Sequence, residues 1–425
     1  MIYNVLLLGS GGREHALAWA ISKSPKLDTL FIAPGNPGTA QVGKNVEFPI
    51  SDFEAVWNFI QQNNINLTVV GPEQPLVDGI ANFLEAKGHM VFGPKLQAAM
   101  LEGSKEFAKE FMQRHNIPTA AYRVFDQDNF DGAADYIKEQ NKYPIVLKAD
   151  GLAGGKGVFI PETEAEAMKV LEQLKTSNSL KEAASRLVIE EFMVGEEASV
   201  FAISDGNSWK VIGNAQDHKR IGEGDTGLNT GGMGAYSPAP VVTDEILKLV
   251  EAEIINPTIS GMREEGNPYS GILYCGLMIT PEGPKVVEYN CRFGDPECQV
   301  ILPRMQSDVL DVILSCTQGK LGKTTIRFDD EVRCCVVLAS GGYPESYEKG
   351  KEITGLDDVE NAIVFHAGTK EENGIIYTNG GRVLNIVASG KDLKSAIDNT
   401  YVQVKKTHFD NAYYRSDIGV KGLKH

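Results

Sequence analysis

The sequence predicts a multidomain protein of the α/β and α+β classes that begins with an open parallel α/β domain. With 425 residues, the chain is about three times as long as a typical domain. Near its start, short apolar runs alternate with amphipathic stretches, which indicates parallel βαβ units with helices on both faces of a sheet. From residue 330 onward, short apolar runs alternate with turns, which predicts a small final α+β domain.

The strands of the first domain are expected at four apolar runs that lead into glycine or proline: NVLLLG, TLFIAPG, LTVVGPE and MVFGP. The amphipathic stretches between them predict helices over residues 15–24, 53–63 and 77–87. Ligands of such sheets bind beyond the carboxyl ends of the strands. Those ends carry the segments GSGGREH, APGNPGT and GPEQPLV, so we expect a binding site there.

A second region follows residue 103. It begins with a charged helix, SKEFAKEFMQRH, and continues with the strands YPIVLKAD and RLVIEEFM. Residues 221–240 hold six glycines and two prolines, which predicts a long loop, and loops of that length are usually functional or disordered. The strands SGILYCGLMI and PKVVEYN and a helix over residues 307–318 are expected next.

The composition excludes several classes of function. The net charge of -16 argues against nucleic acid or an anionic membrane as the main partner, since both require a basic face. Six cysteines without a CxxC pair predict reduced core thiols, not a disulfide framework or a zinc site. The chain has neither the pattern of a signal peptide nor a run of about 20 apolar residues, so we expect a cytoplasmic protein.

The segment GSGGREHA lies at a strand-to-helix turn, where glycines allow close approach of a ligand and helix amides favour an anion. A dinucleotide fingerprint would need a third glycine where Glu14 stands, and this departure weighs against NAD. Two interpretations remain, namely a tight turn that requires glycine for geometry alone and a site for a small phosphorylated or polar ligand.

The segment IVLKADGLAGGKGV places Lys148 at the end of an apolar strand and follows it with a glycine-rich loop that contains Lys156. Backbone amides of such a loop can enclose phosphates while the lysines neutralise their charge. The segment is not a Walker A loop, because the spacing from Gly151 to Gly155 and Lys156 is one residue short and Gly157 replaces the serine or threonine. A solvated flexible loop is the alternative, although an unpaired lysine beside apolar strand residues would be costly.

In RLVIEEFMVGEEASV an apolar strand leads into the carboxylates of Glu190, Glu191, Glu196 and Glu197. Carboxylates so close together repel one another unless donor-rich groups, such as an adenine amino group or ribose hydroxyls, lie among them. A solvated strand end explains this segment equally well.

The segment KVVEYNCRFGDPECQVILP is the most informative. Glu288 and Asn290 are two residues apart on a predicted strand, so both point to the same face and present hard oxygen ligands. Mg²⁺ accepts one or two protein oxygens and completes its shell with phosphate and water. Arg292, two residues further on, would project from the same face toward a carboxylate or phosphate. The alternative is a core glutamate and asparagine with satisfied hydrogen bonds.

The run QDHKR, from Gln216 to Arg220, precedes the predicted long loop. A charge run by itself usually marks a solvated face. Its position before a glycine-rich loop also suits a lid that closes over a site.

Taken together, these motifs resemble those of the phosphoribosylamine-glycine ligases, which are ATP-grasp enzymes of purine biosynthesis. The resemblance extends from GGREHALAW near the start to YYRSDIG near the end, and RFGDPECQVILP is highly specific to that family. It implies an ATP-grasp fold with an N-terminal α/β domain at residues 1–102, an ATP-grasp domain at 103–328 with a lid at about 120–193, and a C-terminal domain at 329–425.

The implied reaction joins glycine to 5-phosphoribosylamine through a glycyl phosphate, giving glycinamide ribonucleotide, ADP and phosphate. By the resemblance, Lys105 and Lys148 hold the ATP phosphates, and Glu288 and Asn290 carry Mg²⁺ or Mn²⁺. The loop and strand end that enclose ATP comprise Gly151, Gly154, Gly155, Lys156, Gly157, Glu190, Glu191, Phe192, Met193 and Glu197.

The substrate residues are hypotheses built on the same resemblance. Arg292 is expected to pair with the glycine carboxylate and Asp217 with its ammonium, and these two together with Lys148 are the expected catalytic residues. The residues expected around phosphoribosylamine are Gly11, Gly12, Arg13, Glu14, Gly38, Thr39, Glu73 and Gly294, with Asn379, Gly380 and Arg382 at its phosphate.

The expected partners are therefore glycine and 5-phosphoribosylamine, with no nucleic acid and no membrane, and with transient contacts to neighbouring purine-pathway enzymes. Two other functions stay open. One is a different ATP-grasp ligase, or a carboxylase that uses bicarbonate in place of glycine. The other is a nucleotide-binding regulator without turnover, against which the presence of Lys148, Glu288, Asn290 and Arg292 argues.

Overall fold

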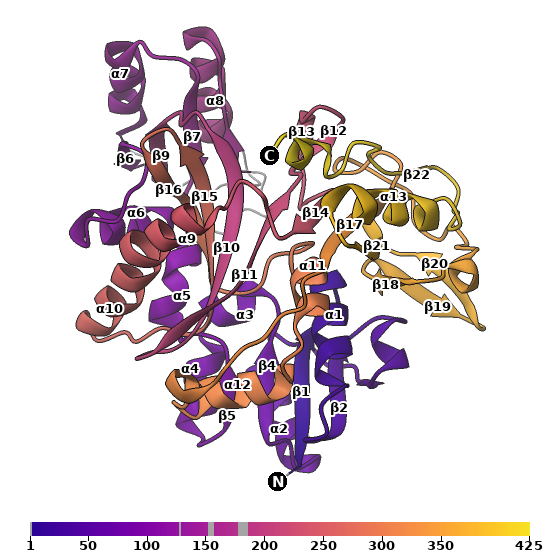
Figure 1. The fold of residues 1–425 in the computed structure, drawn as a ribbon. Coiled ribbons are helices and arrows are strands. Elements are labelled where there is room, and N and C mark those ends of the chain that lie inside the picture. Colours follow the sequence, from indigo (N-terminus) through magenta and orange to yellow (C-terminus); the bar gives the residue numbers. More distant parts are fainter. Residues whose placement is uncertain (1, 127–128, 152–156, 177–185) are drawn as a thin grey trace.

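The computed structural model describes residues 2–126, 129–151, 157–176 and 186–425. It contains a five-stranded sheet at the start of the chain, a four-stranded sheet, and a nine-stranded sheet that continues into the C-terminal region (Figure 1). The predicted mixed α/β fold with an open parallel N-terminal sheet is confirmed. Within the described residues, no helix is both long enough and apolar enough to cross a membrane.

The N-terminal sheet is parallel and has the strand order β3-β2-β1-β4-β5. Its central strand is buried on both faces, because Leu6 and Leu8 pack with one set of helices while Val5 and Leu7 pack with another. The strands are β1 (Tyr3–Gly9), β2 (Leu27–Pro34), β3 (Lys44–Asn45), β4 (Leu67–Val70) and β5 (Met90–Phe92).

Of the three helices predicted in this part, the one over residues 53–63 is observed with nearly the same bounds, and the one over 15–24 is observed over Gly12–Ile21. The predicted helix over residues 77–87 is observed over Ile80–Ala86, and Gly79, with a left-handed φ of 91°, separates it from a short helix over Glu73–Val77. That short helix and the one over Leu96–Gly103 were not predicted. The helices are α1 (Gly12–Ile21), α2 (Phe53–Gln62), α3 (Glu73–Val77), α4 (Ile80–Ala86) and α5 (Leu96–Gly103).

The nine-stranded sheet is antiparallel and joins the middle of the chain to its C-terminal region. Its strand order is β16-β15-β10-β11-β14-β17-β21-β18, with β22 paired to β17, and the β14–β17 pairing connects the two halves. The strands are β10 (Glu196–Asp205), β11 (Trp209–Asp217), β14 (Gly234–Ser237), β15 (Ser270–Thr280), β16 (Gly283–Asn290), β17 (Val332–Ser340), β18 (Ala362–His366), β21 (Arg382–Gly390) and β22 (Ala412–Tyr413).

The four-stranded sheet has the order β6-β9-β7-β8 and is also antiparallel. One face is covered by α7 and α8, whose apolar residues form a core with β7 and β9. Its elements are β6 (Tyr122–Asp126), α7 (Phe130–Gln140), β7 (Ile145–Ala149), β8 (Val158–Phe159), α8 (Glu164–Thr176) and β9 (Arg186–Glu191).

The remaining helices and hairpins connect these sheets. Helices α9 and α10 form one rod, joined by a single π-helical turn over Glu251–Ile255. These elements are α6 (Lys105–Arg114), β12 (Arg220–Gly222), β13 (Thr226–Asn229), α9 (Asp244–Val250), α10 (Asn256–Glu264), α11 (Cys298–Ile301), α12 (Val309–Thr317), β19 (Thr369–Glu372), β20 (Ile375–Thr378) and α13 (Leu393–Val404).

The prediction of a long loop over residues 221–240 is wrong. This segment contains the hairpin β12–β13 and the strand β14. Gly224, with a left-handed φ of 66°, lies in the tight turn between β12 and β13, so this segment is a hairpin and not a flexible loop. The Arg415 side chain fixes the hairpin, since it donates to the Arg220 carbonyl at 3.0 Å and to Asp225 at 2.8 Å.

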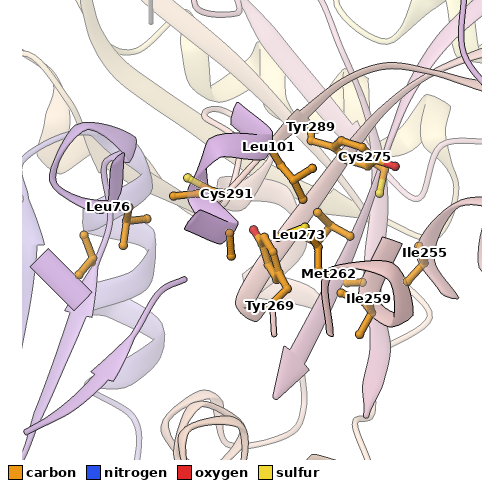
Figure 2. Close-up of a cluster of buried hydrophobic side chains, with 14 of the residues drawn as sticks. Leu76, Leu101, Ile255, Ile259, Met262, Tyr269, Leu273, Cys275, Tyr289 and Cys291 are labelled. Carbon is orange, nitrogen blue, oxygen red and sulfur yellow. The ribbon is translucent and has the colours of Figure 1, made fainter. Parts of the chain in front are cut away.

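A large apolar core joins the N-terminal helices to the nine-stranded sheet. Figure 2 shows Leu76 and Leu101 on the side of the N-terminal helices, and Tyr269, Leu273 and Tyr289 on the side of the long sheet. All six cysteines are free and buried, as expected: Cys275, Cys291, Cys298, Cys316, Cys334 and Cys335. This core sets the distance between the carboxyl edge of the N-terminal sheet and the end of β16.

We expect Arg415→Ala to lower the free energy of unfolding by roughly 2 to 4 kcal/mol, because it breaks an ion pair whose cation is buried. Arg415 is 1% exposed and binds Asp417 with both Nε and Nη2. Urea unfolding followed by fluorescence would measure the change. Lys394→Ala is the control, because its pair with Asp398 is exposed and worth less than about 1 kcal/mol. Equal effects of the two variants would contradict the account.

Candidate active site

Two buried charges meet where the four-stranded sheet faces β16. Lys148, near the end of β7, places its Nζ 2.9 Å from Glu190 Oε2 on the neighbouring strand β9. The same ammonium donates to the Val287 carbonyl of β16 at 3.2 Å. Lys148 is therefore oriented from two sheets at once, and the two residues predicted to hold ATP phosphate and adenosine lie in direct contact.

A second lysine at this point was missed by the sequence reasoning. Lys109 of α6 is 2% exposed, and its Nζ lies 3.3 Å from the same oxygen, Glu190 Oε2. The other oxygen, Glu190 Oε1, is buried and accepts no hydrogen bond from the described residues. Lys109 follows Lys105 by four residues, so both lie on one helix face, and this spacing was the available signal.

Lys105 is the first residue of α6, and the loop after β7 holds it. Asp150 accepts the Lys105 amide at 2.6 Å and the Ser104 hydroxyl at 3.1 Å, and so caps this helix. The Lys105 ammonium donates to the Gly151 carbonyl at 2.8 Å. Burial lowers its pKa, while Glu288 and Asp150 oppose that shift.

Part of the predicted phosphate loop lies outside the described residues, namely Gly154, Gly155 and Lys156. Gly157, which follows that segment, is bonded to β7, since its carbonyl accepts the Ala149 amide at 2.9 Å. Gly151 and Gly157 therefore mark the two ends of the loop beside Lys148.

The predicted metal ligands lie at the end of β16. Glu288 pairs with Gly276 and Asn290 with Tyr274 in the register with β15, so the two residues share a face of the sheet. Partial burial opposes ionisation of Glu288, but the charges of Lys219, Lys148 and Lys105 outweigh it and lower its pKa.

An ionised carboxylate beside an amide is a donor set that suits Mg²⁺, which takes few protein ligands. No group of three or more His, Cys, Asp or Glu side chains with metal-binding geometry occurs among the described residues. The pair therefore fits a cation that is held mainly by phosphate and water.

Lys219 lies beside this pair, so the charge run that precedes the hairpin is not simply a solvated face. Its Nζ is 3.0 Å from Glu197 Oε2 and 3.9 Å from Glu288 Oε1. Lys219 lowers the pKa of the Glu197 carboxyl. Glu197 is half-exposed, and the predicted adenosine residues at the end of β9 are exposed or partly exposed: Glu191, Phe192 and Met193.

Asp217, at the end of β11, is buried. Burial raises the pKa of its carboxyl to about 7, although Lys219 opposes this and nearby Glu297 adds to it. Its carbonyl accepts a hydrogen bond from Lys421 at 2.8 Å, so the C-terminal segment orients this strand end.

Arg292 follows the end of β16 and turns toward the N-terminal part. Its Nε donates to Glu73 Oε2 at 3.0 Å, and its Nη2 donates to Glu102 Oε1 at 2.8 Å. Glu102 also accepts the Cys291 amide at 2.7 Å and was not among the predicted site residues. The structure thus brings two predicted substrate residues, Arg292 and Glu73, into contact.

The GSGGREH segment forms the turn from β1 to α1. The Gly11 amide and the Arg13 Nε both donate to the Glu14 carboxylate at 2.7 Å. Arg13 Nη1 lies 3.9 Å from Glu73 Oε2, and the Arg13 amide donates to Asp295 Oδ2 at 3.2 Å. This geometry joins the carboxyl edge of the parallel sheet to the RFGDPE segment.

The other predicted substrate glycines lie in close contacts around this junction. A Cβ on Gly12 would lie 2.5 Å from the Gln299 side chain, one on Gly38 would lie 2.1 Å from His15, and one on Gly294 would lie 2.3 Å from Glu297. These glycines are therefore required for packing. Thr39 is held in the same loop as Gly38, since its hydroxyl donates to the Asn36 carbonyl at 2.8 Å.

Arg382, predicted to contact substrate phosphate, connects three segments of the protein. Its Nη1 donates to the Asp295 carbonyl at 2.6 Å and to the Gly231 carbonyl at 2.7 Å. Asn379 and Gly380 precede it, where the Asn379 amide donates to Gly368 at 2.7 Å. Arg382 and Arg13 also lower the pKa of Asp295, although burial acts in the opposite direction.

Comparison with known proteins gives a consistent result. Three family models match the chain, described as phosphoribosylglycinamide synthetase N domain (residues 3–102), ATP-grasp (A) domain (103–298) and C domain (333–421). A phosphoribosylamine-glycine ligase of Chlorobaculum tepidum is 48% identical over 425 residues, covering 99% of this chain and 100% of that protein. One of Mesorhizobium japonicum is 50% identical over 418 residues, covering 98% and 97%.

Solved structures extend the comparison. The crystal structure of a phosphoribosylamine-glycine ligase from Thermotoga maritima has a TM-score of 0.85 at 35% identity and covers 98% of this chain and 100% of that one. A biotin carboxylase from Campylobacter jejuni has a TM-score of 0.73 at 14% identity, covering 100% and 96%. At that identity the second likeness concerns the fold alone.

We expect Asp217→Asn to raise the melting temperature at pH 8 relative to the parent protein, and to raise it less at pH 4.5. Because folding raises the carboxyl pKa from 3.8 to about 7, the folded protein binds this proton more tightly than the unfolded chain does. The contribution of the Asp217 carboxyl to the free energy of unfolding is therefore fully present below about pH 4 and is lost as pH rises through about 7. Thermal unfolding at the two pH values would measure the difference.

The exposed Asp330→Asn is the matched control, and its effect on the melting temperature should be the same at both pH values. An Asp217→Asn effect that does not grow with pH would contradict the burial argument.

Proposed function

The chain belongs to the phosphoribosylglycinamide synthetase family, and on that premise we propose that it catalyses the ATP-dependent ligation of glycine to 5-phosphoribosylamine. The products are glycinamide ribonucleotide, ADP and phosphate, in purine biosynthesis. The observation that carries this proposal is the group of lysines around the end of β16. Lys219 Nζ lies 3.9 Å from Glu288 Oε1, Lys148 donates to the neighbouring Val287 carbonyl, and the charges of both, with that of Lys105, lower the pKa of Glu288. Cations gathered around one hard-oxygen ligand suit a metal-bound polyphosphate.

The groups around Glu190 support a nucleotide site. Lys148 and Lys105 come from β7 and α6 and would hold phosphate oxygens, while the loop from Gly151 to Gly157 would cover them. Glu190 Oε1 is buried without a donor from the described residues, and a buried acceptor of this kind is satisfied by a ligand that brings N–H or O–H groups. Adenosine brings both, and would lie along the residues from Glu190 to Met193, with Glu197 beside it.

Glu288 and Asn290 would hold Mg²⁺ or Mn²⁺. Such an ion supplies charge neutralisation to the phosphates that bind it. The two residues would present their oxygens on one face of β16. The nearby lysines lower the pKa of Glu288 and so favour its ionised form.

The chemistry follows from the weak reactivity of a carboxylate. A glycine carboxylate oxygen attacks the γ-phosphorus of ATP, the bond to the bridging oxygen breaks, and ADP leaves. The resulting glycyl phosphate carries a good leaving group. The phosphoribosylamine nitrogen attacks its carbonyl carbon, phosphate departs, and the nitrogen loses a proton to form the amide.

No residue of the protein becomes covalently attached in these steps. The protein contributes positioning, which can supply roughly 7 to 11 kcal/mol, and the lysine charges around the transferring phosphoryl group. Arg292 would pair with the glycine carboxylate and Asp217 with its ammonium.

Phosphoribosylamine would occupy the junction where Arg13, Glu73 and Asp295 approach one another. Gly11, Gly12, Glu14, Gly38, Thr39 and Gly294 border that junction, and Asn379, Gly380 and Arg382 would lie toward the phosphate. We also propose that the reaction takes place in the cytoplasm, with transient contacts to neighbouring enzymes of purine biosynthesis.

The direct test is ADP release with each substrate omitted in turn. Release that needs both glycine and freshly prepared 5-phosphoribosylamine supports the ligase. Release that needs bicarbonate and not glycine would mean a carboxylase on the same scaffold. No release under any combination would mean a nucleotide-binding regulator.

We expect Glu288→Gln to lower kcat by at least about 100-fold, because the amide binds a hard cation far less strongly than the carboxylate. The fold should remain, since the carboxylate is partly exposed and the amide has nearly the same shape. Steady-state ADP release at ordinary magnesium would measure the loss.

Glu282→Gln, at the exposed turn between β15 and β16, is the matched control and should keep the parent rate. Full activity of Glu288→Gln would show that the metal assignment is wrong.

A further inference from the structure

Lys109 is held in place by a contact that does not involve Glu190. Its ammonium donates to the Thr119 hydroxyl at 2.8 Å, and that hydroxyl donates to the Val286 carbonyl at 2.6 Å. Lys109 is 2% exposed and Thr119 joins it to β16. The ammonium therefore has a partner besides Glu190, and this partner fixes its position beside that carboxylate.

Two lysines form ion pairs with the same oxygen of Glu190. Lys148 lies 2.9 Å and Lys109 3.3 Å from Glu190 Oε2, and the carboxylate is 3% exposed. Lys148 cannot give its full charge to a phosphate while it neutralises Glu190. If Lys148 were the sole counter-ion, its transfer to phosphate would leave a buried unpaired carboxylate, which is strongly unfavourable.

We propose that Lys109 is a positioning residue of the nucleotide site, which stays on Glu190 when Lys148 turns to the ATP phosphates. This inference rests on the proposed function, because it takes Lys148 to be a phosphate-binding residue. Lys109 itself touches neither substrate. It acts through Glu190, which it keeps paired and oriented while the other lysine changes partner.

The charges around Lys109 are consistent with this role. Glu190 and Glu191 of β9 raise its pKa, while burial and Lys148 of β7 lower it to about 8, and the Tyr122 ring of β6 lies 5.7 Å from the ammonium. Lys109 is thus mainly charged at pH 7 and loses its charge above about pH 8. Lys148 then becomes the main counter-ion of Glu190, and ATP binding should weaken.

We expect Lys109→Met to raise the KM for ATP about tenfold or more while the KM for glycine stays within about twofold. Lys109→Arg keeps a charge at all pH values and should restore the KM for ATP to within about threefold of the parent. From pH 7 to pH 9 the KM for ATP should rise in the parent and stay flat in Lys109→Arg. Thermal unfolding of both variants checks that they are folded.

Three results would overturn the inference: an unchanged KM for ATP in Lys109→Met, an equal rise in the KM for glycine, or a Lys109→Arg variant no better than Lys109→Met. Lys248→Met, on the exposed face of α9, is the matched control and should resemble the parent.

Lys148→Met separates this inference from the proposed function. If that variant binds ATP as the parent does, the proposed phosphate site is wrong. If it loses ATP binding while Lys109→Met does not, the phosphate site stands and only the role of Lys109 fails.

Discussion

The buried ion pair between Lys148 and Glu190 lies at the point where the four-stranded sheet meets β16, beside the proposed nucleotide site. The two residues lie on adjacent strands, β7 and β9, and Lys148 also reaches the Val287 carbonyl of β16. Charges this deeply buried must have partners, so Glu190 needs a lysine beside it at all times, and two are within reach, Lys148 and Lys109. Two further elements contact the pair. Helix α6 brings Lys109 to Glu190 and carries Lys105, and β16 brings the Val287 carbonyl to Lys148 and carries Glu288.

The rest of the protein holds the other side of the site. The continuous sheet from β16 to β18 carries Glu288 at one end and reaches the C-terminal segment through β14 and β17. From that segment, Arg415 fixes the β12–β13 hairpin and Lys421 binds the Asp217 carbonyl. The segments before and after residue 330 thus form one structure around the site, and a change at the C-terminus can alter the geometry at Asp217 and Lys219.

Local patterns in the sequence predict the strands and most helices, because burial on both sides of a strand requires a continuous apolar run. They also predict Lys148, Glu288 and Asn290, whose spacing on strands is a local property. The hairpin at residues 220–229 was missed because its stability comes from Arg415, which is 190 residues away from its partner Asp225. Glu102 was missed for the same reason, since Arg292 is also 190 residues distant. The roles of the substrate residues and the division into domains stay predictions.

The central claim is that the clustered lysines and Glu288 direct the γ-phosphoryl group of ATP onto the glycine carboxylate. Glycine labelled with ¹⁸O in both carboxylate oxygens tests it most directly, with mass spectrometry of the phosphate released during turnover. The account predicts one ¹⁸O atom in each phosphate, because the oxygen that attacks phosphorus leaves with it when the amine displaces the acyl phosphate. Phosphate that carries no ¹⁸O while the amide product forms, with the displaced oxygen found in water or in AMP, would contradict the account.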